Sequence, residues 1–115
     1  MLRLEYSPAA LDKLGAIYRY ISNDLLNPNG AAKTINSIRE KIRKLKILPE
    51  IGAPLTSRCA EAPEHLRDVT VLLCGNYLTL YSYDGETIKV LCIYHTAEDY
   101  VRHLFEIQVA LEPQK

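Results

Sequence analysis

Apolar and charged side chains alternate over residues 2–6, immediately before the first proline of the chain. A period of two predicts a short strand with one buried face. Ser7 and Pro8 follow, and this pair is typical of a helix N-terminus: a serine side chain caps a free backbone amide, and proline loses no hydrogen bond at the first helical position.

Two apolar stripes with steps of three and four residues predict two helices. The first helix runs from Pro8 to about Asp24 and the second, which starts with a repeated cap signal at Asn27 and Pro28, ends before Pro49. The stripes are Leu11, Leu14, Ile17, Ile21 and Leu25, and then Ala31, Ile35, Ile38, Ile42 and Leu45. Because only a few residues join the two helices, we expect an antiparallel hairpin.

Three strands are expected after an irregular loop over 49–63. They cover 69–73, with Val69, Val71 and Leu73 on one face, then 77–83 and 87–95. The turn at Gly75-Asn76 joins the first two, and Asp84-Gly85 predicts a type I′ hairpin in which both residues have positive φ. The last strand is apolar at almost every position and is therefore expected to be buried on both faces.

A third helix is expected after the last strand. Thr96 and Asp99 fit a capping box, and the apolar stripe behind them consists of Tyr100, Leu104, Ile107 and Leu111. The element order is then β-α-α-β-β-β-α in one domain over 1–115. This order predicts an α+β fold: a meander of three antiparallel strands, an added N-terminal strand, and a helical hairpin over one face.

Composition narrows the class of protein. With 48% apolar and 24% charged residues the chain suits a folded globular domain, and no apolar run approaches the length of a membrane span. Since charged residues interrupt the N-terminus, we predict no signal peptide and a cytoplasmic location. Cys59, Cys74 and Cys92 form no CxxC pair, so we predict reduced thiols, with no metal and no cofactor.

Charge is distributed unevenly behind a formal net charge of zero. Residues 33–58 hold seven basic and two acidic side chains, whereas residues 59–115 hold four basic and nine acidic ones. Five basic residues fall within eight positions of the second helix: Arg39, Lys41, Arg43, Lys44 and Lys46. A solvated helix face explains this run, and so does an acidic binding partner.

Five segments of the chain, in order, resemble RelE/ParE-superfamily toxins of bacterial type II toxin-antitoxin (plasmid stabilisation) modules. The segments are Tyr6-Ser-Pro-Ala-Ala-Leu-Asp12, Ile21-Ser-Asn-Asp-Leu-Leu-Asn-Pro28, Leu48-Pro-Glu-Ile-Gly52, Gly75-Asn-Tyr-Leu-Thr-Leu-Tyr81 and Ile93-Tyr-His-Thr-Ala-Glu-Asp-Tyr100. The resemblance implies a growth-inhibiting toxin with a microbial RNase-like sheet and a cognate antitoxin as partner.

The resemblance implies one of two modes of action. RelE-type toxins cleave mRNA on the ribosome, which needs an acid or base and fixed cations at the phosphate. In this chain the residues that would serve are Arg67, Tyr81, Lys89 and His95. ParE-type toxins instead bind DNA gyrase and need no catalytic groups. The antitoxin or target would contact the basic run together with Tyr100 and Arg102.

Departures from the nuclease pattern favour the gyrase mode. Relatives that cut RNA carry an arginine just after the first tyrosine of the 77–83 strand, where this chain has Leu78 and Thr79. They also carry one or two arginines just after the His95 position, where it has Thr96 and Ala97. Losing one such cation costs two or three orders of magnitude in rate. The alternatives are a ribosome-dependent endoribonuclease and a non-toxic relative that only binds an antitoxin.

Two features of the strands allow a structural or a functional interpretation. Tyr77, Tyr81 and Tyr83 share one face of their strand, where they can pack against the helical hairpin or stack on bases. His95 ends its strand, where an imidazole can act as a general base or bond to the backbone of the following turn.

Overall fold

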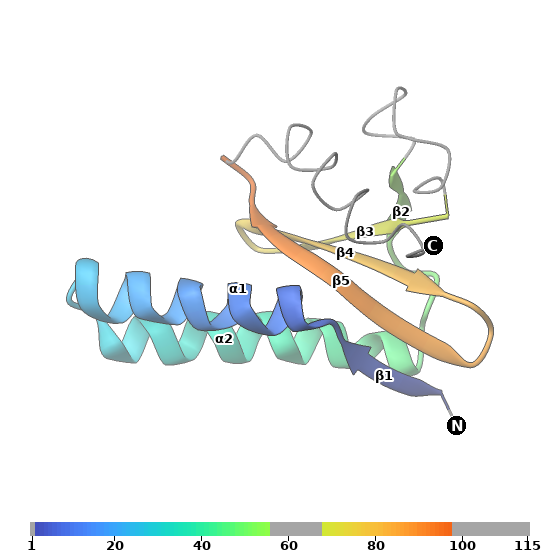
Figure 1. Cartoon of the computed structure of the whole chain (residues 1–115), viewed down its shortest axis with the longest axis horizontal. Coiled ribbons are helices and arrows are strands. Elements are labelled where there is room, and N and C mark those ends of the chain that lie inside the picture. The colour runs from blue at the N-terminus through green and yellow to red at the C-terminus, as the bar shows by residue number, and fades with distance from the viewer. Residues whose placement is uncertain (1, 56–67, 98–115) are drawn as a thin grey trace, which may run out of the picture.

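The computed structural model describes residues 2–55 and 68–97 and shows two helices packed on a five-stranded sheet (Figure 1). The elements are β1 (Arg3–Tyr6), α1 (Pro8–Arg19), a π-helical turn (Tyr20–Asp24), α2 (Pro28–Arg43), a 3-10 turn (Lys44–Lys46), β2 (Ala53–Pro54), β3 (Thr70–Cys74), β4 (Tyr77–Tyr83) and β5 (Thr87–His95). The predicted α+β architecture is confirmed.

Both helices begin at the predicted caps. The Ser7 hydroxyl accepts a hydrogen bond from the Ala10 amide at 3.0 Å, and the Asn27 side chain accepts one from the Gly30 amide at the same distance. The Ser7 hydroxyl also donates to the Leu91 carbonyl at 2.7 Å, so the cap ties the start of α1 to β5. The helices form an antiparallel hairpin that crosses one face of the sheet and extends past the strand ends (Figure 1).

The strand order is β1-β5-β4-β3-β2. Strands β3, β4 and β5 form the expected antiparallel meander, and β1 adds to it in parallel with β5. The two-residue strand β2 pairs with β3 inside the segment expected to be an irregular loop. Its sequence, Ala53-Pro54, carries no strand signal, since proline cannot donate to a ladder and is confined to edges.

Apolar side chains are buried on both faces of the sheet. On the helical side, the core of α1 and α2 packs against Leu72, Tyr81, Ile88, Val90 and Ile93. On the opposite side a second cluster is formed by Leu55, Val69, Val71, Leu78, Leu80, Leu91, Cys92 and Tyr94. Strand β5 contributes to both clusters, as its continuous apolar sequence predicted.

A β-bulge interrupts the pairing of β4 with β5. Leu80 pairs with Cys92 and Tyr81 pairs with Val90, so Leu91 has no opposite residue. Leu91 and Cys92 therefore both belong to the cluster away from the helices, although they are neighbours in sequence. An extra residue of this kind changes which face every later side chain occupies.

Two local predictions are wrong, and a third concerns residues that the structure does not describe. Leu73 was expected to share a face with Val69 and Val71, and those two are buried in the cluster away from the helices, but Leu73 itself is 46% exposed, while its neighbour Leu72 is buried against the helices. The hairpin at Asp84 exists, but of its residues only Gly85 has a positive φ, at 99°, so the type I′ turn is wrong. The predicted helix after Thr96 lies outside the described residues apart from its first two positions.

Candidate functional site: the two ends of the central strands

Tyr81 lies inside the protein rather than on the surface of the sheet. Its side chain is 0% exposed, and its hydroxyl donates to the Pro49 carbonyl at 2.8 Å and accepts from the Gly52 amide at 3.2 Å. Burial raises the pKa of this tyrosine, so the hydroxyl keeps its proton. The structure therefore gives Tyr81 a positioning role for the loop between α2 and β2.

Tyr77 and Tyr83 flank Tyr81 on the helical face, and both pack against the same core. This arrangement agrees with the structural interpretation of the tyrosine row.

Lys89 lies at the start of β5, in acidic surroundings. It pairs with Ser82 on the face away from the helices and lines a cavity of about 670 Å³. Three carboxylates line the same cavity, those of Glu5, Asp68 and Asp84. Their negative charge opposes the approach of a phosphate to Lys89.

His95 lies at the other end of β5, on the helical face. It pairs with Tyr77, and the two rings meet edge to face with centroids 5.1 Å apart. The Nδ1 atom accepts a hydrogen bond from the Ala97 amide at 3.0 Å, so a neutral His95 carries its proton on Nε2. This is the backbone contact expected from the structural interpretation of a strand-end histidine.

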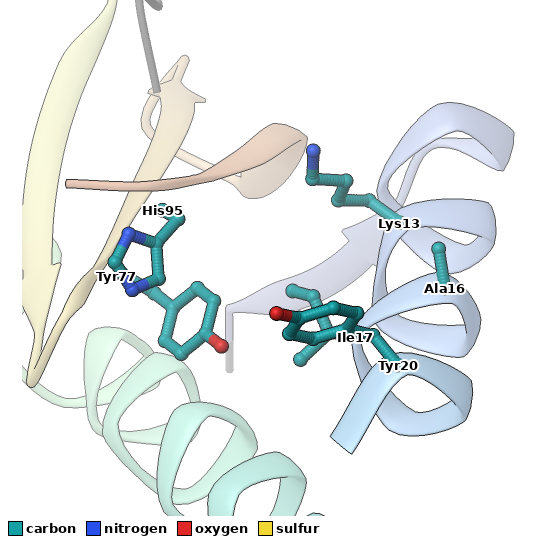
Figure 2. A pocket seen from close by; sticks show the side chains of 6 residues that line it. All are labelled: Lys13, Ala16, Ile17, Tyr20, Tyr77 and His95. Carbon is teal, nitrogen blue, oxygen red and sulfur yellow. The ribbon is translucent and has the colours of Figure 1, made fainter. Parts of the chain in front are cut away.

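A cavity of about 340 Å³ opens beside His95. Figure 2 shows His95 and Tyr77 on one side of it and Lys13, Ile17 and Tyr20 of the α1 region on the other. The Lys13 ammonium also lies 5.6 Å from the centre of the Tyr94 ring. Nothing in the sequence distinguishes Lys13 or Tyr20 as site residues, because neither belongs to a motif.

A second cavity of about 330 Å³ shares one lining residue, Tyr77, with the first. Its α2 side is formed by Lys33, Ser37 and Lys41, and Asn76 contributes from the turn between β3 and β4. We refer to the two cavities together as the Tyr77 cleft. The α2 side of this cleft is predictable from the sequence, because Lys33, Ser37 and Lys41 are spaced four positions apart and residues with that spacing share a helix face.

The basic run of α2 does not form one surface. Lys41 lines the Tyr77 cleft, whereas the Arg39 guanidinium lies 5.1 Å from the centre of the Tyr6 ring, beside β1. Arg43 pairs with Glu40 at 2.7 Å in an exposed position. Lys44 and Lys46 belong to the 3-10 turn that follows. Because these residues lie at different angles around the helix axis, their charged groups lie beside different parts of the protein.

The predicted catalytic group is not assembled among the residues that the structure describes. Tyr81 is buried, and Lys89 and His95 line different cavities at opposite ends of β5. A rise of about 3.3 Å per residue places those two backbones roughly 20 Å apart. Arg67, Tyr100 and Arg102 lie outside the described residues, as does Cys59.

Two free cysteines, Cys74 and Cys92, are buried. Burial raises the pKa of the Cys74 thiol, which disfavours the reactive thiolate. Over residues 2–55 and 68–97 no group of three or more His, Cys, Asp or Glu side chains could hold a metal ion. In the same part of the chain no helix is long and apolar enough to span a membrane.

Comparison with known proteins agrees with this fold. A solved structure titled "Chromosomal ParDE TA system from P. aeruginosa" superimposes with a TM-score of 0.65 at 24% sequence identity, covering 83% of this chain and 96% of the other. No curated protein sequence matched the chain. Residues 4–100 match the family described as the ParE toxin of the type II toxin-antitoxin system parDE. The chain therefore belongs to the ParE toxin family, within the RelE/ParE superfamily.

Proposed function

We propose that this toxin stops bacterial growth by binding an essential protein, DNA gyrase, and that a cognate antitoxin neutralises it. Membership of the ParE family supports the toxin role, and the ParDE title of the similar structure supports an antitoxin partner. The proposal takes the protein to be an inhibitor that acts by binding rather than an enzyme.

The observation that carries this choice is the separation of Lys89 from His95. Cleavage of RNA requires a base, an acid and fixed cations around one phosphate, within hydrogen-bonding distance of it. Here the lysine shares its cavity with three carboxylates and the imidazole lies at the far end of the same strand. Binding to a protein surface has no such requirement.

Induced expression in a bacterial host tests the proposal. We expect growth arrest with a DNA-damage response and filamentation while bulk translation, measured by amino-acid incorporation, continues. The variant His95→Ala should arrest growth as the wild type does, because no chemical step depends on the imidazole. An immediate stop in protein synthesis with codon-phased mRNA cuts would instead favour the ribosome-dependent endoribonuclease.

A purified system identifies the target. The toxin should inhibit DNA supercoiling by gyrase and increase the amount of cleaved DNA trapped on the enzyme, and premixing with the antitoxin should prevent both effects. Expression without any effect on growth would contradict the proposal and favour a module that only binds antitoxin.

A further inference from the structure

Helix α1 carries more apolar side chains than the core of the protein takes up. Leu14 and Ile17 are buried in the core on the helical side of the sheet, whereas Leu11 and Tyr18 are 48% and 41% exposed. Leu11 belongs to the apolar stripe that the sequence predicts for this helix, so only part of that stripe is used inside the protein. Exposed apolar side chains that share a face are typical of a contact with another protein.

Leu11 and Tyr18 share one face of α1 with Gly15. The three positions are four and three residues apart, a spacing that places side chains on one side of a helix. Beyond the neighbouring residues and the helix backbone, a Cβ atom at Gly15 would have only the end of the Arg19 side chain within 4 Å. The face therefore has a low point between two large side chains, where a second helix can approach closely.

Charged side chains flank this face in a self-complementary order. Asp12 and Arg19 are both exposed, and because they are seven positions apart they lie on the same flank of the face. If two copies of α1 pack antiparallel about a two-fold axis beside Gly15, the same flank of each copy meets the other. Along the helix, Asp12 then lies about 4.5 Å and Arg19 about 6 Å from that axis, in opposite directions. Each Asp12 is thus level with Arg19 of the other copy to within about 1.5 Å.

The apolar side chains obey the same symmetry. With the axis beside Gly15, Leu11 of one copy is level with Tyr18 of the other to within about 1.5 Å. Each leucine can therefore pack against a tyrosine ring of the other copy. A parallel pair of helices would turn the two flanks to opposite sides of the interface and would not bring Asp12 to Arg19. The charges thus favour the antiparallel arrangement.

The charge on this face argues against a strongly charged partner. One acidic and one basic side chain flank the apolar pair, so a polyanion or a polycation would meet one attractive and one repulsive group. A second copy of the chain instead supplies both signs at matching positions. It also supplies a large apolar side chain opposite each exposed one.

From these observations we infer that α1 is a self-association surface: a second copy of this chain packs antiparallel on it, with Leu11 against Tyr18 and Asp12 paired with Arg19 of the other copy. Two large apolar side chains from each copy make a small interface, so we expect a weak dimer with a dissociation constant of about 100 µM. The inference goes beyond the proposed function and does not depend on the target of the toxin.

Sedimentation velocity of the purified full chain tests the inference directly. At low salt, from about ten-fold below to about ten-fold above the expected dissociation constant, the average mass should rise from that of a monomer toward that of a dimer. Asp12→Arg and Arg19→Asp each turn two attractive pairs into repulsive ones, and each should raise the dissociation constant by about five- to ten-fold. The double variant Asp12→Arg, Arg19→Asp exchanges the charges and should restore the dimer.

Two further variants separate the contact itself from general effects. Lys46→Asp is the matched control for Arg19→Asp, because it changes the charge equally at an exposed position outside α1, and it should leave the dimer unchanged. Leu11→Ser with Tyr18→Ser removes the apolar contact at two exposed positions and should give a monomer at every concentration. Circular dichroism checks that each variant is folded.

Several results would overturn the inference. A wild type that stays monomeric throughout would do so, as would an equal weakening by Lys46→Asp and Arg19→Asp. A folded charge-exchange variant that fails to dimerise would contradict the antiparallel pairing. If the wild type is monomeric and the serine variant loses inhibition of gyrase or binding of the antitoxin, the face belongs to that partner instead. A wild type that dimerises but does not arrest growth would refute the proposed function and support the present inference.

Discussion

At the Lys89 end of β5, three carboxylates line a cavity of about 670 Å³, whereas at the His95 end the Tyr77 cleft is lined by lysines and a histidine. One strand therefore runs from an acidic to a basic environment. A chain with a formal net charge of zero can thus present two surfaces of opposite sign, each suited to a different partner.

The two ends also differ in how they are built. Near the acidic end, the buried Tyr81 hydroxyl fixes the loop that leads into β2 through Pro49 and Gly52. At the basic end, Lys33, Ser37 and Lys41 line the cleft from exposed positions of α2, and Asn76 lines it from a tight turn. We therefore expect substitutions near Tyr81 to reduce stability, and substitutions in the Tyr77 cleft to affect binding.

The largest effect should come from Gly52→Ala. A Cβ atom there would lie 2.7 Å from the Val71 carbonyl oxygen, 2.7 Å from Thr70 Cγ2 and 2.9 Å from the Tyr81 hydroxyl. Because the carbonyl belongs to a paired strand, the loop must move, and we expect a loss of about 2–3 kcal/mol in the free energy of unfolding, measured by urea denaturation.

Gly15→Ala is the matched control for that substitution. The nearest atom to its Cβ is the end of the flexible Arg19 side chain at 3.2 Å, and alanine favours a helix over glycine. Unchanged or higher stability is expected. Equal losses of stability from Gly52→Ala and Gly15→Ala would contradict the idea that the loop near Tyr81 tolerates substitution less well than the helix surface does.

Tyr81→Phe should have the next largest effect. It keeps the packing of the ring but removes both hydrogen bonds to the loop, for an expected loss of about 1–2 kcal/mol. Burial raises the folded-state pKa of Tyr81, so its contribution is present below the unfolded pKa of about 10 and is lost as pH rises through the folded value. The variant should lose less stability than the wild type at alkaline pH, and a parallel pH dependence would contradict this.

The smallest effect is expected from Asp84→Asn. The amides of Thr87 and Glu86 each donate to the carboxylate at 2.8 Å and lower the pKa of Asp84. The contribution of the ionised group is thus present above the unfolded pKa of 3.8 and is lost as pH falls through the lower folded value. Thermal unfolding should show a small deficit for the variant at neutral pH that narrows in acid, and a deficit that widens in acid would refute the assignment.

The sequence was sufficient for the parts of the fold that depend on local signals. The caps at Ser7 and Asn27 and the stripes of the two helices follow from rules that act within one or two turns, and the structure has both helices where they were predicted. The meander was predictable for the same reason, since short turns join its strands.

The candidate sites depend on contacts that no local pattern contains. The Tyr81 hydroxyl binds a loop about thirty positions earlier in the sequence, so its positioning role could not be separated from a surface role. The basic residues of α2 could be read from the sequence. That Arg39 lies beside Tyr6 while Lys41 lines the Tyr77 cleft depends on where the sheet packs against the helix, which the sequence pattern does not specify.

The β-bulge between β4 and β5 could not be predicted from the sequence for a different reason. Residues 90–93 are all apolar, so the segment shows no alternation whose interruption could be seen.

That bulge has a consequence for engineering. In β5, Lys89 and His95 are separated by an even number of positions, so an uninterrupted strand would present both side chains on the same face. The unpaired Leu91 shifts the alternation by one, and they lie on opposite faces. A designer who wished to bring a cation and an imidazole onto one face of this sheet would therefore have to delete a residue before substituting any.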